Sequence, residues 1–184
     1  VVVGVLRGVV NTQLVGQIVA LGGRAVGLCG VDGGLVTAER YDGRLGFVGR
    51  ITGVDAEVLR GLLDSGIIPV IAPIGLEAPA QPLNINADTV AGEVARALRA
   101  DSLVFLTDVE GLLDGQGVLV PELDRARATA LREAGVLAGG MIPKVDACFR
   151  AAEAGVAASM ADGTVPGMLR RVASGERVGT RIVA

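Results

Sequence analysis

The stretch SLVFLTDVEGLL, residues 102–113, decides the fold class of this chain. Its first half is a short apolar run, and polar residues with a glycine follow where the run ends. A run of this length and ending indicates a buried strand that leads into a turn. Near-continuous apolar strands are typical of parallel sheets that helices cover on both faces.

Helical and strand patterns alternate on both sides of this stretch. The run IIPVIAPIGL, residues 67–76, predicts a second buried strand, and shorter strands are predicted at 24–30, 35–40, 46–54, 155–163 and 179–184. Apolar residues at helical spacing, glycine stops and possible caps predict helices from Val2 to the Gly22–Gly23 pair and over 55–63, 87–100, 125–135, 139–155 and 165–175. The alternation predicts an α/β fold with a mostly parallel sheet between layers of helices.

Composition excludes several classes of function. The chain has 184 residues, a net charge of −3 and only 2% aromatic residues, so a basic, aromatic nucleic-acid platform is not expected. It contains no histidine, which rules out a histidine-dependent triad or zinc site within it. The two cysteines are far apart in the sequence and form no metal-binding spacing, so we interpret them as buried thiols in a reducing compartment. No apolar run approaches the ~18 residues of a membrane span. We therefore expect a cytoplasmic protein that binds neither nucleic acid nor membrane.

Three polar or glycine-rich clusters follow predicted strands, where ligands of α/β sheets collect. In LNINAD, residues 83–88, Asn84 and Asp88 share a helical face if the turn winds straight into the helix, and they would then orient a polar substrate and a cation. The simpler alternative is that one of them caps the helix. In LTDVEG, Thr107 and Asp108 end the apolar strand, and the acidic group either holds a metal, a ribose or a neighbouring backbone, or lies in a turn that bonds its own backbone. GLCGVDGG, residues 27–34, is interpreted as a structural turn.

Lys144 is the only lysine among 17 basic residues, and it lies in GGMIPKV, residues 139–145. The glycine pair exposes backbone N–H groups at a predicted helix start, where the helix dipole favours phosphate. The ammonium group of a lysine, on its flexible side chain, can follow a moving phosphoryl group, whereas the guanidinium group of an arginine is planar and rigid. A solvated surface lysine is the alternative, but the uniqueness of Lys144 favours a functional role. No GxxxxGK[ST] stretch is present, so a Walker-type nucleotide site is ruled out.

LNINAD, LTDVEGLL and GGMIPKV, in this order within the predicted elements, resemble the amino acid kinase family and, within it, the acetylglutamate kinase branch. The resemblance covers the whole chain. It implies a three-layer αβα sandwich with a mostly parallel central sheet. Residues 1–100 would be the remainder of an N-terminal lobe for acyl-amino-acid binding and dimerisation, and residues 101–184 a C-terminal ATP-binding lobe. In the family a lysine-bearing strand and a glycine triplet come earlier, so we expect this sequence to be part of a longer chain.

The resemblance implies ATP-dependent phosphorylation of the γ-carboxylate of N-acetyl-L-glutamate, the second step of arginine biosynthesis. ATP and Mg²⁺ would be required, with no metal ligand from the protein, and a homodimer or higher homo-oligomer is expected. Lys144 corresponds to the lysine that stabilises the transferring phosphoryl group, Asp88 to the aspartate that organises the site, and Asn84 to a ligand of the acyl amino acid. The nucleotide-binding positions would be Asp108, Val109, Glu110, Gly111, Leu112, Leu113, Val136, Leu137 and Ala138.

Two further interpretations remain open from the sequence. One is that the chain serves another acceptor of the family, such as aspartate, glutamate, UMP or a carrier-bound aminoadipate. The other is that it is a non-catalytic ligand-binding remnant if it is complete. The apolar stripe of the opening helix is interpreted first as ordinary core and second as a contact between two copies of the chain, because a helix near this place contributes to homodimers in the family.

Overall fold

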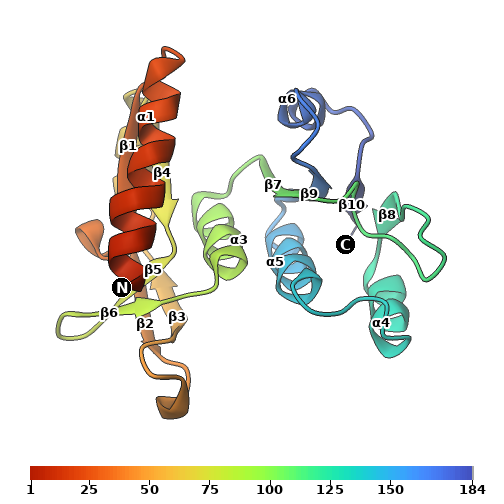
Figure 1. The fold of residues 1–184 in the computed structure, drawn as a ribbon, viewed down its shortest axis with the longest axis horizontal. Helices are drawn as coiled ribbons and strands as arrows, with labels where there is room; N and C mark the ends of the chain where they lie inside the picture. The colour runs from red at the N-terminus through yellow and green to blue at the C-terminus, as the bar shows by residue number, and fades with distance from the viewer. Residues whose placement is uncertain (184) are drawn as a thin grey trace. The chain divides into compact units, whose positions relative to one another are not determined.

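The computed structural model describes residues 1–183; Ala184, at the end of the predicted strand 179–184, lies outside the described residues. The chain forms an N-terminal unit, Val1–Val90, and a C-terminal unit that begins at Ala91. Figure 1 labels the helices and strands. The N-terminal elements are η1 (Gly4–Asn11), α1 (Thr12–Ala20), β1 (Ala25–Cys29), η2 (Asp32–Gly34), β2 (Val36–Arg40), η3 (Gly43–Leu45), β3 (Gly49–Val54), α2 (Glu57–Asp64), β4 (Ile68–Ala72), β5 (Ile74–Glu77) and β6 (Gln81–Asn84). Helix α3 (Ala87–Leu98) joins the units, and β7 (Ser102–Thr107), β8 (Glu122–Leu123), α4 (Arg125–Glu133), α5 (Met141–Glu153), β9 (Ala157–Asp162), α6 (Met168–Ala173) and β10 (Thr180–Ile182) follow.

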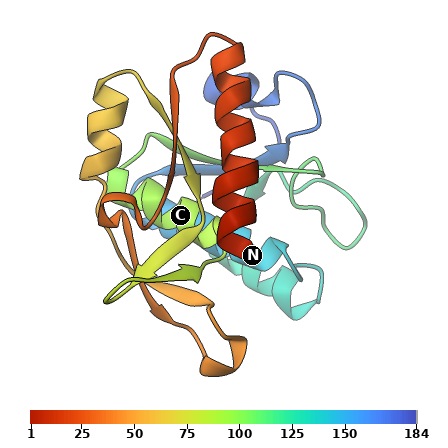
Figure 2. The ribbon, with the colours of Figure 1, turned by 60° about the vertical axis from the view of Figure 1, so that its left-hand side comes forward.

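The predicted opening helix is present, and its first part, η1, has π-helical hydrogen bonding before α1 continues it. Asn11, only 3% exposed, fastens this helix to the strands, because its side-chain Nδ2 donates to the carbonyl oxygens of Val70 (2.8 Å) and Leu28 (3.4 Å). Figure 2 shows the helix running beside β1. The interpretation of its apolar stripe as ordinary core is wrong for most positions, since at least 42% of each of these residues is exposed: Val2, Val5, Val9, Val10, Leu14 and Val19.

The predicted single strand over residues 67–76 is also wrong, because it is two strands in two different sheets. β4 pairs in parallel with β1, from Ala25 opposite Ile68 to Cys29 opposite Ala72. β5 instead lies between β2 and β6. Pro73 lies between β4 and β5, and a proline has no N–H group to donate to a neighbouring strand. The carbonyl oxygen of Pro73 accepts a hydrogen bond from the Ile85 N–H at 3.0 Å.

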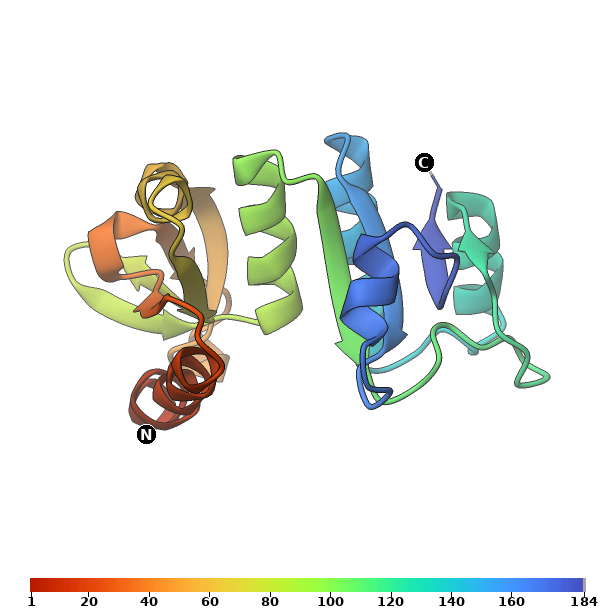
Figure 3. The same cartoon turned by 90° about the horizontal axis from the view of Figure 1, so that it is seen from above.

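The N-terminal unit places its strands between helices. The second sheet has the order β3-β2-β5-β6, in which β2 and β3 form the predicted antiparallel hairpin. Figure 3 shows α2 and the N-terminal helix on opposite sides of the strands. Helix α2 begins after Asp55, whose Oδ1 accepts from the Glu57 N–H at 3.1 Å, and it buries Leu59 completely.

The C-terminal unit has one four-stranded sheet of order β7-β9-β10-β8, with α5 and α4 on one face and α6 on the other (Figure 1). Strand β7 alternates buried and exposed residues, so Leu103 and Phe105 turn toward the core that α5 covers. Its parallel partner β9 contributes Ala158 and Met160 to the same core. This arrangement of helix, sheet and helix is the predicted α/β sandwich.

Most element types were predicted correctly, and strands β6 and β8 were missed. Four of the seven pairings between described strands are parallel, so the prediction of mostly parallel strands is confirmed. The two units meet in sequence between Val90 and Ala91, inside α3, and the binding roles assigned to 1–100 and 101–184 stay predictions. No helix in the described part of the chain combines the length and the apolar character needed to cross a membrane.

Candidate functional site

Asn84 and Asp88 lie on either side of a short turn in the N-terminal unit. Asn84 ends β6, where its backbone N–H donates to the Phe47 carbonyl oxygen at 2.8 Å. Asp88 lies in the first turn of α3, so the turn does not wind straight on and the two side chains do not share a helical face. The half-buried side-chain amide of Asn84 has no hydrogen-bond partner among residues 1–183 and is available to a ligand.

The helix cap that the sequence predicted for this turn is Asn86, a residue that neither alternative singled out. Its Oδ1 accepts from the backbone N–H of Thr89 at 3.0 Å and from the Thr89 hydroxyl at 3.2 Å. An N-cap bond of this kind fixes the start of a helix. Because Asn86 carries out the capping, the side chains of Asn84 and Asp88 are not needed for it.

The segment Asp108–Leu113 begins with an exposed bend after β7. Thr107, the last residue of the strand, donates its hydroxyl to the Val109 carbonyl oxygen at 2.7 Å and accepts from the Val109 N–H at 3.4 Å. The hydroxyl of Thr107 therefore bonds the backbone of its own turn, which is one of the alternatives that the sequence left open for Thr107 and Asp108. Asp108, Val109 and Glu110 are exposed to solvent.

The same segment ends in the core of the C-terminal unit. Leu112 is 2% exposed and Gly111 is buried against Thr180, where a Cβ atom on Gly111 would lie 2.6 Å from the threonine Oγ1. The Leu112 N–H donates to that oxygen at 2.8 Å. Leu113 forms an isolated bridge with Leu119. The predicted nucleotide-binding segment 108–113 therefore consists of an exposed bend, residues 108–110, and a part that is packed into the core, which includes Gly111 and Leu112.

Lys144 is the fourth residue of α5 and is half buried. Gly139 has φ 55°, and Gly140 is the N-cap without any side-chain cap. The first two helix amides do not stay free as predicted, because Met141 and Ile142 donate to the carbonyl oxygens of Ala138 and Gly139 at 3.2 Å each. The glycine pair thus builds a tight turn that presents a lysine one turn into a helix, where the dipole and the ammonium both favour an anion.

Segment 136–138 leads directly into this turn. Leu137 is 1% exposed and shares the core with Leu112 and Val145, whereas Val136 is half buried and Ala138 is exposed. The core therefore brings together the segment after β7, the segment before the glycine pair and the first turns of α5. The buried side chains of Leu112 and Leu137 serve packing, and the nucleotide-binding role of these two positions stays a prediction.

Helix α5 is held by charged contacts with α4. Arg132 donates to Asp146 Oδ1 at 2.7 Å, and Arg125 pairs with Glu153 while its guanidinium lies 4.8 Å from the centre of the Phe149 ring. Exposed pairs of this kind each contribute little stability. The orientation of α5 follows from the face that it buries in the core, which includes Val145, Cys148 and Phe149.

The predicted site residues are distributed over both units. Asn84 and Asp88 belong to the N-terminal unit, and the nucleotide-binding positions and Lys144 belong to the C-terminal unit. Within residues 1–183 no group of three or more histidine, cysteine, aspartate or glutamate side chains is arranged to hold a metal ion.

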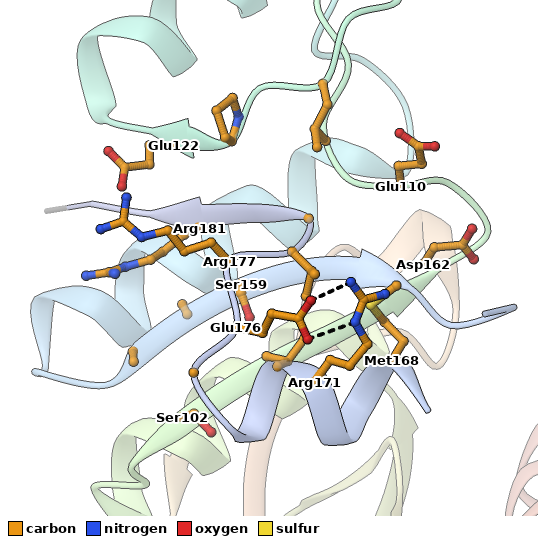
Figure 4. A pocket seen from close by; sticks show the side chains of 18 of the residues that line it. Ser102, Glu110, Glu122, Ser159, Asp162, Met168, Arg171, Glu176, Arg177 and Arg181 are labelled. Atoms are coloured by element: carbon orange, nitrogen blue, oxygen red, sulfur yellow. Dashed lines mark hydrogen bonds and ion pairs between the residues drawn. The ribbon is translucent and has the colours of Figure 1, made fainter. Parts of the chain in front are cut away.

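A cavity of about 930 Å³ lies on the α6 side of the C-terminal sheet, and Figure 4 shows it from close by. Glu110 is the only predicted nucleotide-binding residue that lines it, and Lys144 does not. Arg171 crosses it in a bidentate pair with Glu176 (2.6 and 2.9 Å), which lowers the pKa of that carboxyl below its ordinary value. The hydroxyl and N–H of Thr164 lower the pKa of Asp162 in the same way. Acidic and basic side chains both line the cavity.

The sequence pattern of the amino acid kinase family matches residues 2–160. The chain belongs to the amino acid kinase family. It is 48% identical over 185 residues to an acetylglutamate kinase of Synechococcus sp. (strain RCC307), an alignment that covers 97% of this chain and 62% of that protein. An acetylglutamate kinase of Acidiphilium cryptum (strain JF-5) is 47% identical over 88% of this chain and 59% of its own length. The chain thus spans about three fifths of the curated relatives it matches.

The solved structures agree with this membership of the amino acid kinase family. The crystal structure of smu.665 from Streptococcus mutans UA159 superposes with a TM-score of 0.85 at 28% identity, covering 98% of this chain and 69% of that one. Family membership accounts for the order of the three motifs and for the α/β sandwich. The roles of single residues stay predictions.

Proposed function

We propose that this protein phosphorylates the γ-carboxylate of N-acetyl-L-glutamate with ATP, the second step of arginine biosynthesis. The observation that supports this most strongly is the 42–48% identity to acetylglutamate kinases across nearly the whole chain. The placement of Lys144 at a glycine-opened helix start is consistent with it, since that arrangement favours phosphate.

In the proposed reaction a γ-carboxylate oxygen attacks the terminal phosphorus of ATP in line with the bond to the β-phosphate. The new P–O bond gives an acyl phosphate, and the electron pair of the broken bond leaves with ADP. Little covalent chemistry falls to the protein, so its work is positioning and charge stabilisation. Asn84 would orient the acceptor, Asp88 would organise the cationic groups, and Lys144 would neutralise charge on the transferring oxygens.

The exposed bend Asp108–Glu110 and the turn before α5 would hold the nucleotide. Their backbones lie beside a shared core, which keeps them in a fixed arrangement. Mg²⁺, when bound, would neutralise phosphate charge.

The test is ADP release by the purified full-length protein, measured with ATP·Mg and one acceptor at a time. We expect turnover with N-acetyl-L-glutamate. Turnover only with aspartate, glutamate, UMP or a carrier-bound aminoadipate would assign a sister activity of the family. Nucleotide binding by calorimetry without turnover on any acceptor would indicate a ligand-binding protein and overturn the proposal.

We further propose a cytoplasmic homo-oligomer. Both cysteines, Cys29 and Cys148, are buried thiols without a disulfide, which suits a reducing compartment. The exposed apolar stripe of the opening helix offers a surface for a second copy of the chain, because monomeric proteins rarely expose such a continuous apolar face.

A further inference from the structure

Thr180 is one of only two fully or nearly buried polar side chains that the structure describes, the other being Asn11. It begins β10, where it pairs with Met160 of β9, and none of its surface is exposed. The mechanism proposed above does not use it. A buried hydroxyl must find hydrogen-bond partners to offset its lost hydration, so its partners indicate what it does.

The hydroxyl of Thr180 bridges the two sides of the hairpin that follows β7. Its Oγ1 accepts from the Leu112 N–H at 2.8 Å and donates to the Val120 carbonyl oxygen at 2.7 Å. The Val120 N–H bonds the Leu112 carbonyl oxygen directly, at 2.8 Å. In an antiparallel pair two such residues exchange both bonds directly. Here the threonine hydroxyl takes the place of the second bond and holds the two backbones apart.

Gly111 leaves room for this hydroxyl because it has no side chain. Its φ is 156°, and a Cβ atom would lie 2.6 Å from Thr180 Oγ1 and 2.9 Å from the Thr180 N atom. The last part of the segment Asp108–Leu113 therefore rests on one buried hydroxyl, while Thr107 bonds its first part through Val109. Between these two anchors lies the bend that is exposed to solvent.

We propose that Thr180 is a positioning residue for the nucleotide: its hydroxyl, inserted between Leu112 and Val120, sets the backbone conformation of the segment Asp108–Leu113 that holds ATP. The inference rests on the proposed function, because it takes that segment to bind ATP. Thr180 does not itself touch substrate, so it should affect nucleotide affinity and not the phosphoryl-transfer step.

The test is a series of substitutions at Thr180 in the full-length protein, assayed by steady-state kinetics and by calorimetry with ATP·Mg. Valine keeps the shape and removes the hydroxyl, which leaves the Leu112 N–H and the Val120 carbonyl without their partner. We expect T180V to raise KM for ATP about tenfold or more, with kcat and KM for the acceptor within about twofold of wild type. T180S keeps the hydroxyl and should restore the wild-type KM for ATP.

Two further variants keep the test decisive. T180C carries a weaker hydrogen-bonding group and should give an intermediate KM for ATP, so it takes over if T180V does not fold. T129V is the matched control, because Thr129 donates its hydroxyl to the Arg125 carbonyl oxygen on α4, away from the segment, and should leave every parameter unchanged.

The outcomes separate the two proposals. If wild type binds no ATP·Mg, the proposed function fails. If wild type binds it and folded T180V or T180C binds it equally well, only the role of Thr180 is refuted. A loss of kcat at constant KM for ATP would equally refute it.

Discussion

At the scale of single residues, Lys144 shows how far a sequence can predict a site. Its uniqueness and the glycines before it predicted a lysine at a helix start, which the structure confirms. The sequence also indicated Asn84, whose side-chain amide has no hydrogen-bond partner among residues 1–183, and its binding role stays a prediction. Thr180 and Asn86 could not be predicted from the sequence. A buried threonine is recognised by partners from distant segments, and a capping asparagine by where the helix starts.

Replacing Lys144 with alanine tests the proposed chemistry. We expect kcat to fall ~10²–10³-fold in the full-length protein, as for other groups that stabilise charge in a transition state. Arginine should restore little of it, because a planar guanidinium does not follow the moving phosphoryl oxygens as an ammonium does. The measurement is acetylglutamate-dependent ADP release, with Arg170→Ala on α6 as a control cation. Near wild-type kcat in K144A would remove the lysine from the mechanism.

Asp114 provides a prediction about acid stability. Its carboxylate accepts from the N–H groups of Val118 (3.0 Å) and Gln116 (2.9 Å), bonds that lower its pKa below the ordinary value. A lowered folded-state pKa contributes stability above the unfolded pKa and loses it as pH falls through the folded pKa. We expect wild type to exceed D114N in unfolding midpoint at pH 7, and the difference to shrink toward pH 3. A difference that is constant with pH would contradict this origin.

At the scale of elements, periodicity located helices and strands well but could not assign strands to sheets. The run 67–76 contains two prolines, and a proline alone does not separate one long strand from two short ones, because Pro69 lies inside β4 whereas Pro73 divides β4 from β5. The division depends on which strands lie beside it, and β6, which pairs with β5, was itself taken for a turn. Helix α3, in contrast, was predicted within two residues of its observed end, because its apolar spacing is regular.

Two helical glycines give opposite predictions on substitution with alanine. In α3 a Cβ on Gly92 would lie 2.9 Å from Ala147 Cβ and 3.3 Å from its backbone, so G92A should destabilise the fold by about 1–3 kcal/mol despite the better helix propensity of alanine. In α2 a Cβ on Gly61 meets nothing within 4 Å, so G61A should stabilise by roughly 0.5–1 kcal/mol. Urea unfolding of both variants checks the signs. Equal effects would show that α3 and α5 are not closely packed there.

At the scale of the whole molecule, the class of fold followed from the alternation of elements alone, and the family followed from three motifs in order. The exposure of the opening helix did not follow, since an apolar stripe looks the same whether it faces a core or a second copy of the chain.

That stripe predicts self-association. We expect the purified protein to sediment as a dimer or larger species, because burying the exposed valines of η1 and α1 against a second copy removes them from water. Val9→Glu, at a position 49% exposed, should shift the protein toward monomer without unfolding it. Val118→Glu, at an exposed position of the C-terminal unit, is the control. A wild type that sediments as a monomer at all concentrations would refute the prediction.

The division of one apolar run at Pro73 has a consequence for how this chain can vary. Residues on the two sides of the proline face different neighbours, each with a fixed side-to-side alternation. Removing or adding one residue in 67–76 would turn a whole strand inside out, so we expect this stretch to keep a constant length while its individual apolar residues interchange. Changes in length should instead be absorbed by the exposed turn at residues 78–80.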